Sequence, residues 1–87
     1  MSRETLLEFP AEFPIKVMGR EGSELRALTQ AIVERHAGAL GDERIRQRGS
    51  SDGNFVAITF TILAQSQHQL DAIYTELTAC KAVLMAL

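Results

Sequence analysis

The chain has 87 residues, enough for one small domain with a modest hydrophobic core. Its composition, 46% hydrophobic and 23% charged, is that of an ordinary soluble globular protein. The net charge of −2 argues against nucleic-acid binding over the whole surface, although a local basic patch is compatible with it. No apolar segment approaches the roughly 20 residues of a membrane helix, no signal peptide is recognisable, and the single cysteine excludes an internal disulfide. We therefore expect a soluble cytoplasmic protein without membrane contact.

Residues 1–12 are predicted to form an N-terminal arm that precedes a single domain over residues 13–87. The arm contains Leu6, Leu7, Phe9 and Pro10. With Pro14 following closely, the two prolines leave little room for a helix after Phe9. Its apolar side chains are expected to cover part of the core; docking on a partner is the alternative.

The first half of the domain reads as a strand followed by a helix. Phe13–Met18 alternates between two faces and predicts a short strand, which two glycines end. Ser23 is the predicted N-cap of the helix, and Gly38 the predicted stop. The helix is expected to bury one apolar stripe, made of Leu25, Leu28, Ile32 and His36.

The clearest strand pattern is Phe55–Ala64. Its large apolar side chains alternate with small or hydroxylated ones, which predicts a central strand with one covered face and one open face. The covered set is Val56, Ile58, Phe60 and Ile62. Before it, Glu43–Arg48 is a weaker strand prediction, supported by the turn-rich residues 49–54 that would complete a hairpin.

A second helix and a final strand complete the domain. Ser66 and Gln69 form a capping-box pattern that predicts the helix start. Helical spacing then links Leu70, Ile73, Tyr74, Leu77 and Cys80. The continuous apolar run Ala82–Leu87 predicts the last strand.

The order β-α-β-β-α-β predicts an α+β fold of the ferredoxin-like class. Right-handed crossovers place the strands in the order 4-1-3-2, all neighbours antiparallel, with both helices on one face. In this arrangement the covered side chains of the central strand should contact Leu28, Ile32, Ile73 and Leu77.

Five segments in this order and spacing also carry a resemblance to a known family. They are L-L-E-F-P at 6–10, F-P-I-K-V-M-G at 13–19, R-H-A at 35–37, S-S-D-G-N-F at 50–55 and I-Y-T-E-L at 73–77. Together they resemble the YbeD-like family of small bacterial proteins, with Val56 and Ala57 less polar than the family pattern suggests. The resemblance implies a ferredoxin-like fold similar to the ACT regulatory domains that sense amino acids. It implies no established activity.

The residues available for catalysis or metal binding are few. His36 and His68 would lie at neighbouring helix ends, but Cys80 is 12 positions beyond His68, about 18 Å along a helix. A Cys–His pair and a three-ligand metal site are therefore not expected. Cys80 is interpreted as a buried small apolar residue. We expect no enzyme, no cofactor and no metal.

The candidate binding residues lie on the open sheet face and in one turn. Arg44, Arg46 and Arg48 would project from one edge and Leu84 with Ala86 from the other, with Lys16 between them. The two edges would be about 14 Å apart, a span that suits a partner protein rather than an amino acid. Gly19, after the first strand, is a second candidate, by analogy with the effector turn of ACT-like domains.

Two interpretations of this face stay open. The arginines can bind a partner, or they can simply solvate an edge strand and prevent aggregation. The final strand, apolar on both faces, is a candidate for homo-oligomer contacts. We expect a non-catalytic regulatory or interaction domain that binds a partner protein or a small effector. An RNA-binding module is the alternative, although Phe55 is the single aromatic residue expected on the open face.

Overall fold

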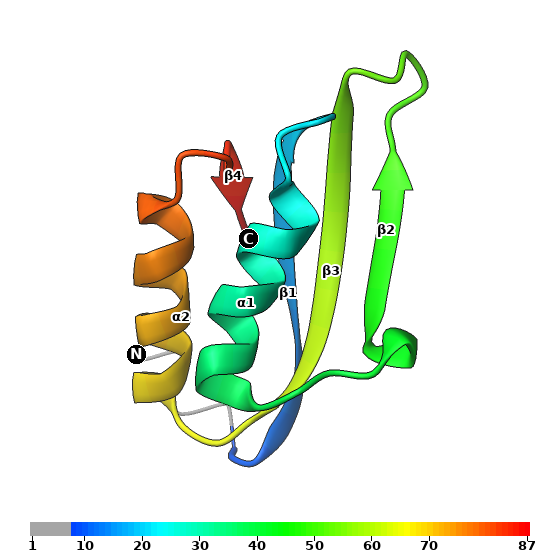
Figure 1. The fold of residues 1–87 in the computed structure, drawn as a ribbon. Helices are drawn as coiled ribbons and strands as arrows, with labels where there is room; N and C mark the ends of the chain where they lie inside the picture. Colours follow the sequence, from blue (N-terminus) through cyan, green and yellow to red (C-terminus); the bar gives the residue numbers. More distant parts are fainter. Residues whose placement is uncertain (1–7) are drawn as a thin grey trace, which may run out of the picture.

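The computed structural model describes residues 8–87 as a sheet with two helices packed on it (Figure 1). The elements in chain order are β1 Ala11–Arg20, α1 Leu25–Ala37, the 3-10 turn η2 Asp42–Arg44, β2 Ile45–Gly49, β3 Phe55–Ala64, α2 Gln67–Ala79 and β4 Met85–Ala86. The predicted order of strands and helices is confirmed. Leu6 and Leu7 of the predicted arm lie outside the described residues.

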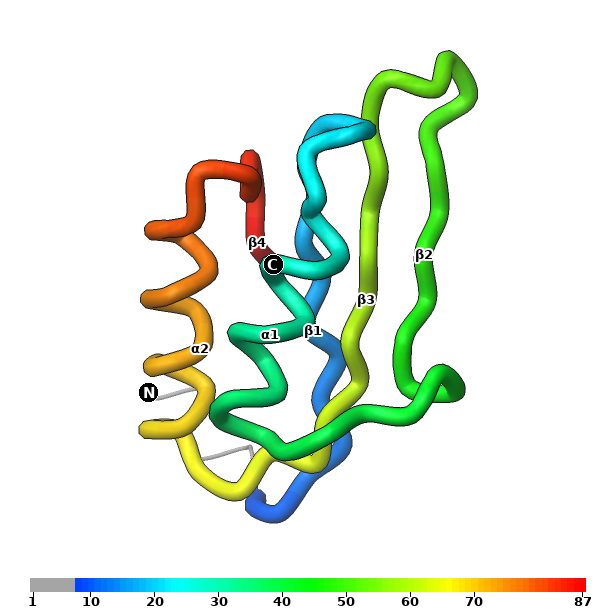
Figure 2. The backbone as a smooth tube through the Cα atoms, in the orientation of Figure 1, coloured from blue at the N-terminus to red at the C-terminus, as the bar shows by residue number. Residues whose placement is uncertain are grey.

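The sheet has the strand order β2-β3-β1-β4, and every neighbouring pair is antiparallel. This is the predicted order 4-1-3-2 counted from the opposite edge, so the ferredoxin-like fold is confirmed. Figures 1 and 2 show both helices on the same side of the sheet, with β2 standing beyond the helix layer. Within residues 8–87 no helix lies on the other side of the sheet, which we call the open face.

β3 has the predicted bounds and the predicted division of its side chains. Val56, Ile58, Phe60 and Ile62 are all buried under the helices. Phe60 is fully buried in one core with Ile73 and Leu77, and Ile32 packs against that core. Leu28 does not belong to this core, so the contact expected from it is wrong.

α1 is rotated about its axis relative to the prediction. Leu25, Thr29 and Val33 are buried, whereas Leu28 is 43% exposed. The expected stripe favoured the large residue Leu28, but the structure buries the smaller Thr29, whose hydroxyl donates a 2.6 Å hydrogen bond to the Leu25 carbonyl oxygen. A satisfied hydroxyl can be buried at little cost, and apolar periodicity does not detect it.

The two helices begin differently. Ser66 caps α2 as predicted, because its hydroxyl accepts a 3.1 Å hydrogen bond from the Gln69 backbone N–H. Ser23 does not cap α1: its hydroxyl donates to the Arg20 carbonyl oxygen, and the N-cap residue is Glu24 in a left-handed conformation with φ 62°. Gly38 ends α1 with φ 88°, as predicted.

Three segments differ in length from the prediction. β1 begins at Ala11, within the predicted arm, and Phe9 packs against the core just before it. β2 begins at Ile45 instead of Glu43, because Glu43 and Arg44 belong to η2. β4 is only two residues long, since residues 81–84 form a turn and a bend before it.

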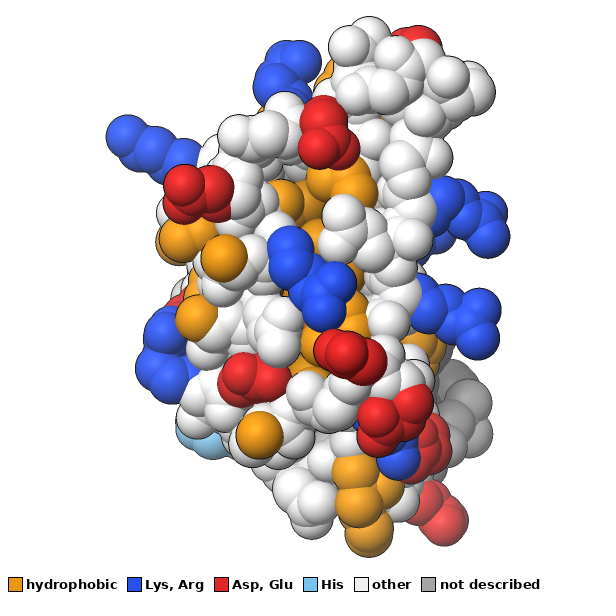
Figure 3. All heavy atoms as spheres, turned by 45° about the vertical axis from the view of Figure 1, so that its right-hand side comes forward, with side chains coloured by type: hydrophobic (Ala, Val, Ile, Leu, Met, Phe, Trp, Pro, Cys, Tyr) orange, Lys and Arg blue, Asp and Glu red, His pale blue; other side chains and the backbone are white. Residues whose placement is uncertain are grey.

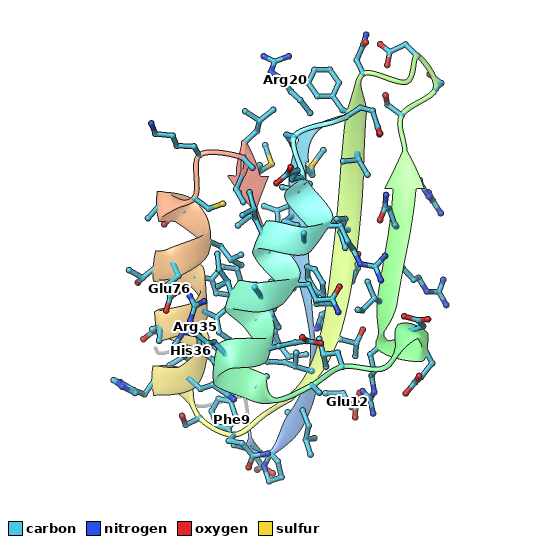
Figure 4. The ribbon with its side chains drawn as sticks, in the orientation of Figure 1. Phe9, Glu12, Arg20, Arg35, His36 and Glu76 are labelled. Carbon is cyan, nitrogen blue, oxygen red and sulfur yellow. The ribbon has the colours of Figure 1, made fainter. Side chains whose placement is uncertain are left out.

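The helices are joined to each other at their outer surfaces. The Glu76 carboxylate of α2 pairs with Arg35 and, at 2.6 Å, with His36 Nε2, both on α1 (Figure 4). The hydrogen bond from His36 is the main cause that lowers the pKa of the Glu76 carboxyl. Gln69 adds a hydrogen bond to the His36 carbonyl oxygen at the same end of α1.

Candidate functional site: the open face of the sheet

The strand register determines which side chains share the open face. Directly opposite residues of antiparallel strands project to the same side. Lys16 of β1, Thr59 of β3 and Arg46 of β2 are opposite one another, and so form one row across the sheet. Met18, Ala57 and Arg48 form the next row.

Three cations of these rows surround a hollow of about 450 Å³, which we call the cationic hollow. Its lining residues are Lys16, Arg46, Gln47, Arg48, Ala57 and Thr59. Ala57 and Thr59 form the floor because their side chains are small, and the longer side chains on either side stand above them. The volume falls within the range of small-ligand sites. Figure 3 shows basic side chains projecting from the side of the molecule formed by β2.

The cations of the hollow have no acidic partner among residues 8–87. Lys16, Arg46 and Arg48 all have exposed side chains. Within the described part of the chain, solvent and counterions therefore balance their mutual repulsion on this face. Such a cluster favours an incoming anion, because it would neutralise charges already close together.

Arg44 differs from the other two arginines of the predicted set. It belongs to η2, and its guanidinium pairs with the Glu12 carboxylate of β1 at 2.5 Å. That hydrogen bond raises the pKa of Arg44 further above its ordinary value. Arg44 does not line the cationic hollow. The prediction of three equivalent arginines on one strand is therefore wrong for Arg44.

A second, smaller hollow of about 150 Å³ adjoins the cationic one, and we call it the apolar hollow. Its lining residues are Met18, Arg48, Gly49, Ser50, Phe55, Val56 and Ala57. Arg48 and Ala57 line both hollows, so the two lie side by side. Phe55 is 37% exposed, and the Arg20 guanidinium lies 5.5 Å from the centre of its ring.

The opposite edge of the open face is apolar, but through different residues from those predicted. Ala86 is opposite Val17, which is buried under the helices, so Ala86 lies on the helix side. Met85 is opposite Met18 on the open face, and Leu87 exchanges both backbone hydrogen bonds with Lys16. Met85 and Leu87 therefore supply the exposed apolar edge.

Leu84, the candidate predicted at this edge, lies in the bend before β4 and is exposed. The continuous apolar run Ala82–Leu87 predicts a strand over its whole length. In the structure this segment enters the sheet only at Met85, which changes the side chains that reach the open face. Hydropathy alone does not show where such a short strand begins.

Gly19 is a packing position. A Cβ atom placed on it would lie 2.5 Å from the Ala82 carbonyl oxygen and 2.9 Å from a methyl group of Leu25. The backbone of the segment before β4 thus passes directly over Gly19 and fills the space on that side of it. The glycine allows this close approach.

A hollow of about 170 Å³ also lies on the helix side, between the start of α1 and the two strands β2 and β3. Leu25, Val56 and Ile58 contribute apolar lining. Arg26 reaches across from α1 to the Gln47 side chain at 3.3 Å. In Figure 3 a basic side chain crosses an apolar floor in this region. Because the Arg26 side chain spans this hollow, we do not treat it as a candidate binding site.

His36, His68 and Cys80, for which no catalytic or metal-binding role was expected, lie in three different environments. His36 pairs with Glu76, His68 is exposed, and Cys80 is half-buried at the end of α2, not fully buried. Within residues 8–87 no three His, Cys, Asp or Glu side chains are grouped as metal ligands, and no helix there is long and apolar enough to cross a bilayer.

These features define a small ferredoxin-like α+β domain with a charged open sheet face. The fold is similar to the solved C-terminal domain of the MgtC protein from Mycobacterium tuberculosis, with a TM-score of 0.62 and 12% identity over 93% of this chain and 88% of that one. At that identity the likeness concerns the fold alone. The chain itself belongs to the family described as "Protein of unknown function (DUF493)", whose model matches residues 4–87.

Similar bacterial proteins support this membership. A UPF0250 protein from Chromobacterium violaceum is 40% identical over 85 residues, which cover 98% of this chain and 96% of the relative. Another, from Paraburkholderia phytofirmans, is 38% identical over 84 residues, which cover 97% and 94%. The YbeD-like resemblance is thereby confirmed.

Proposed function

We propose that this chain is a non-catalytic interaction domain that binds an acidic protein partner on the open face of its sheet. The observation that carries the proposal is the pairing of two different edges on one uncovered face. One edge carries the cationic hollow, and the other carries the exposed apolar side chains Met85 and Leu87.

The two edges would act differently on a partner. Exposed cations raise the association rate with an acidic surface and fix its orientation, whereas apolar side chains supply affinity as water leaves them. Met85 is 49% exposed and Leu87 62% exposed, so both are available to a partner. About 14 Å separates the edge strands of a four-stranded sheet, a width that a protein surface can cover.

The test compares one variant at each edge of the sheet with a control variant outside the open face, in which the net charge changes by the same amount as in Arg46→Glu. Immobilised parent protein, Arg46→Glu, Met85→Asp and Lys81→Glu are incubated with bacterial extract, and the retained proteins are quantified. Lys81→Glu changes the net charge by the same amount as Arg46→Glu, but it lies in the turn after α2. Parent and control should retain the same acidic partner, and each face variant should retain at least tenfold less.

Salt distinguishes the two edges further. The defect of Arg46→Glu should lie mainly in the association rate and weaken as salt rises, because salt screens exposed charges. The defect of Met85→Asp should persist at high salt. A partner that binds both face variants as tightly as the parent would show that the open face is only a solvated surface.

A further inference from the structure

We propose that the cationic hollow and the apolar hollow together form a binding site for a small phosphate monoester that carries a flat or aliphatic organic group. The phosphate would lie among Lys16, Arg46 and Arg48, and the organic group would extend toward Phe55. This ligand goes beyond the protein partner proposed above, and its binding can be measured without any partner present.

The spacing of the cations suits one phosphate group. Lys16 and Arg46 flank Thr59 from the two neighbouring strands, so their backbones are about 10 Å apart, two strand spacings. Each side chain spans about half that distance, so their charged ends can converge above Thr59. Arg48 lies two residues from Arg46 on the same face of β2. Three cations and one hydroxyl thus line one hollow.

The chemistry of these groups favours phosphate over a carboxylate. A phosphate monoester carries close to two negative charges near pH 7 and offers three terminal oxygens as acceptors. Two guanidinium groups can each donate two parallel hydrogen bonds to such oxygens, and Lys16 and Thr59 can donate to those that remain. A carboxylate has one charge and two oxygens, which would leave two of the three cations without compensation.

The nearby carboxylates are already engaged elsewhere. Glu12 pairs with Arg44, and neither residue lines the cationic hollow. Asp52, in the turn between β2 and β3, accepts hydrogen bonds from the Ser50 hydroxyl and the Asn54 backbone, and the bond from Ser50 is the main cause that lowers the pKa of its carboxyl. These acids are held by local contacts, so they do not compete with a ligand for the three cations.

The apolar hollow gives the ligand a direction. It opens from the cationic hollow at Ala57 and Arg48 and continues to Phe55. Thr59 and Phe55 are four residues apart on an extended strand, which corresponds to about 13 Å. A phosphate ester about 10 Å long can therefore place its charge at one end and its organic group on Met18 and Phe55.

A single ester fits this face better than a nucleic-acid strand. Single-strand binding uses several stacking aromatics along a basic groove. Within residues 8–87, Phe55 is the aromatic residue that lines the open-face hollows. Phe60 is fully buried in the core, and the net charge is −2.

The test is a titration of labelled protein followed by amide chemical shifts in phosphate-free, low-salt buffer. The probes are adenosine 5′-monophosphate, inorganic phosphate, adenosine and a short oligoadenylate. The monophosphate should shift amides of both hollows, including Thr59 and Phe55, and bind several-fold tighter than inorganic phosphate. Adenosine alone should not bind measurably, and the oligoadenylate should bind no tighter per site than the monophosphate.

Variants locate the site. Arg46→Gln and Lys16→Gln should each weaken binding of the monophosphate by at least tenfold. Lys81→Gln is the matched control, because it removes a cation in the turn after α2, away from both hollows, and it should bind like the parent. Unchanged spectra of the parent and the three variants at millimolar monophosphate would overturn the proposal, as would binding that Arg46→Gln leaves intact.

The remaining outcomes are also decisive. Equal binding of monophosphate and inorganic phosphate would overturn the role of the apolar hollow. Much tighter binding of the oligoadenylate, with a steep dependence on salt, would replace the small ligand with a nucleic acid. Because no partner protein is present, a failure here leaves the capture experiment untouched, and a failed capture leaves this titration untouched.

Discussion

Neighbouring residues of β3 lie on opposite faces of the sheet, and the two faces differ in almost every physical property. Phe60 and Ile58 face the helices and are fully buried. Thr59 between them faces outward, into a row with Lys16 and Arg46. The helix side is close-packed and apolar, whereas the open face is hollowed and cationic.

This difference separates stability from binding. Side chains under the helices contribute through burial, which amounts to a few kcal/mol for a large apolar residue. Exposed cations such as Arg46 contribute little to folding, because water solvates them in both states. The open face can therefore be changed without unfolding the protein, which makes its binding role testable by substitution.

The largest expected effect comes from substituting adjacent β3 residues on the two faces. Phe60→Ala should lower the free energy of unfolding by about 3–5 kcal/mol, because it leaves a cavity in the core. Thr59→Ala, one residue away on the open face, should change it by less than about 1 kcal/mol. Urea denaturation of both variants measures the contrast. Similar losses in the two would mean that the helices do not cover the Phe60 face.

Two glycines provide the next contrast. Gly19→Ala should destabilise by about 1–3 kcal/mol, because the added methyl would press on the Ala82 carbonyl oxygen and displace the segment before β4. Gly49→Ala is the matched control at the uncovered edge. The nearest atom to its added Cβ, the Phe55 carbonyl oxygen, is 3.9 Å away, and the change should lie within about 0.5 kcal/mol.

Urea denaturation of the two glycine variants measures this difference in the free energy of unfolding. A tolerated Gly19→Ala would show that the segment before β4 can move aside at no cost. In that event the space over Gly19 would become available to a ligand, and the effector role expected for this turn would have to be reconsidered.

Most of the fold could be predicted because it rests on long periodic segments. Alternation over the ten residues of β3 defined both its bounds and its buried face. The sequence of strands and helices then restricted the topology to one common arrangement. Errors occurred where a local contact decides the outcome, as at Thr29, which is buried with its hydroxyl bonded to Leu25.

The candidate site was predicted less completely, for two physical reasons. Arg46 and Arg48 follow strand alternation, so their face was correct, but the Glu12 partner of Arg44 depends on η2, whose three residues carry no periodic pattern. β4 is too short to show alternation, so Met85 and Leu87 could be placed only through the register with β1.

The helix layer offers a smaller contrast between its two helix starts. Ser66→Ala should destabilise by about 1 kcal/mol, because the Gln69 backbone N–H loses its acceptor at the start of α2. Ser23→Ala should change stability by less than about 0.5 kcal/mol, since Ser23 does not cap α1. Thermal unfolding of the two variants measures the difference. A larger effect at Ser23 would contradict the observed start of α1.

The smallest expected effect comes from the ion pairs, one between the two helices and one between β1 and η2. Glu76→Gln should lower the free energy of unfolding, because it weakens the contacts of Glu76 with α1. Glu12→Gln, which breaks the more exposed pair with Arg44, should have a still smaller effect. The folded-state pKa of the Glu76 carboxyl lies below its ordinary value of 4.5, mainly through the hydrogen bond with His36 and secondly through Arg35. Its stabilising contribution is therefore present above about pH 4.5 and is lost as the pH falls through the folded-state pKa.

The measurement is a double-mutant cycle of Glu76→Gln and His36→Asn, followed by urea denaturation between pH 3 and pH 7. The coupling between the two positions should be favourable at pH 6, where Glu76 is ionised, and should vanish once its carboxylate is protonated. His36→Asn keeps a polar side chain on α1 but removes the imidazole that contacts Glu76. A coupling that did not change as the Glu76 carboxylate became protonated would mean that the two side chains interact through packing and not through the charge of Glu76.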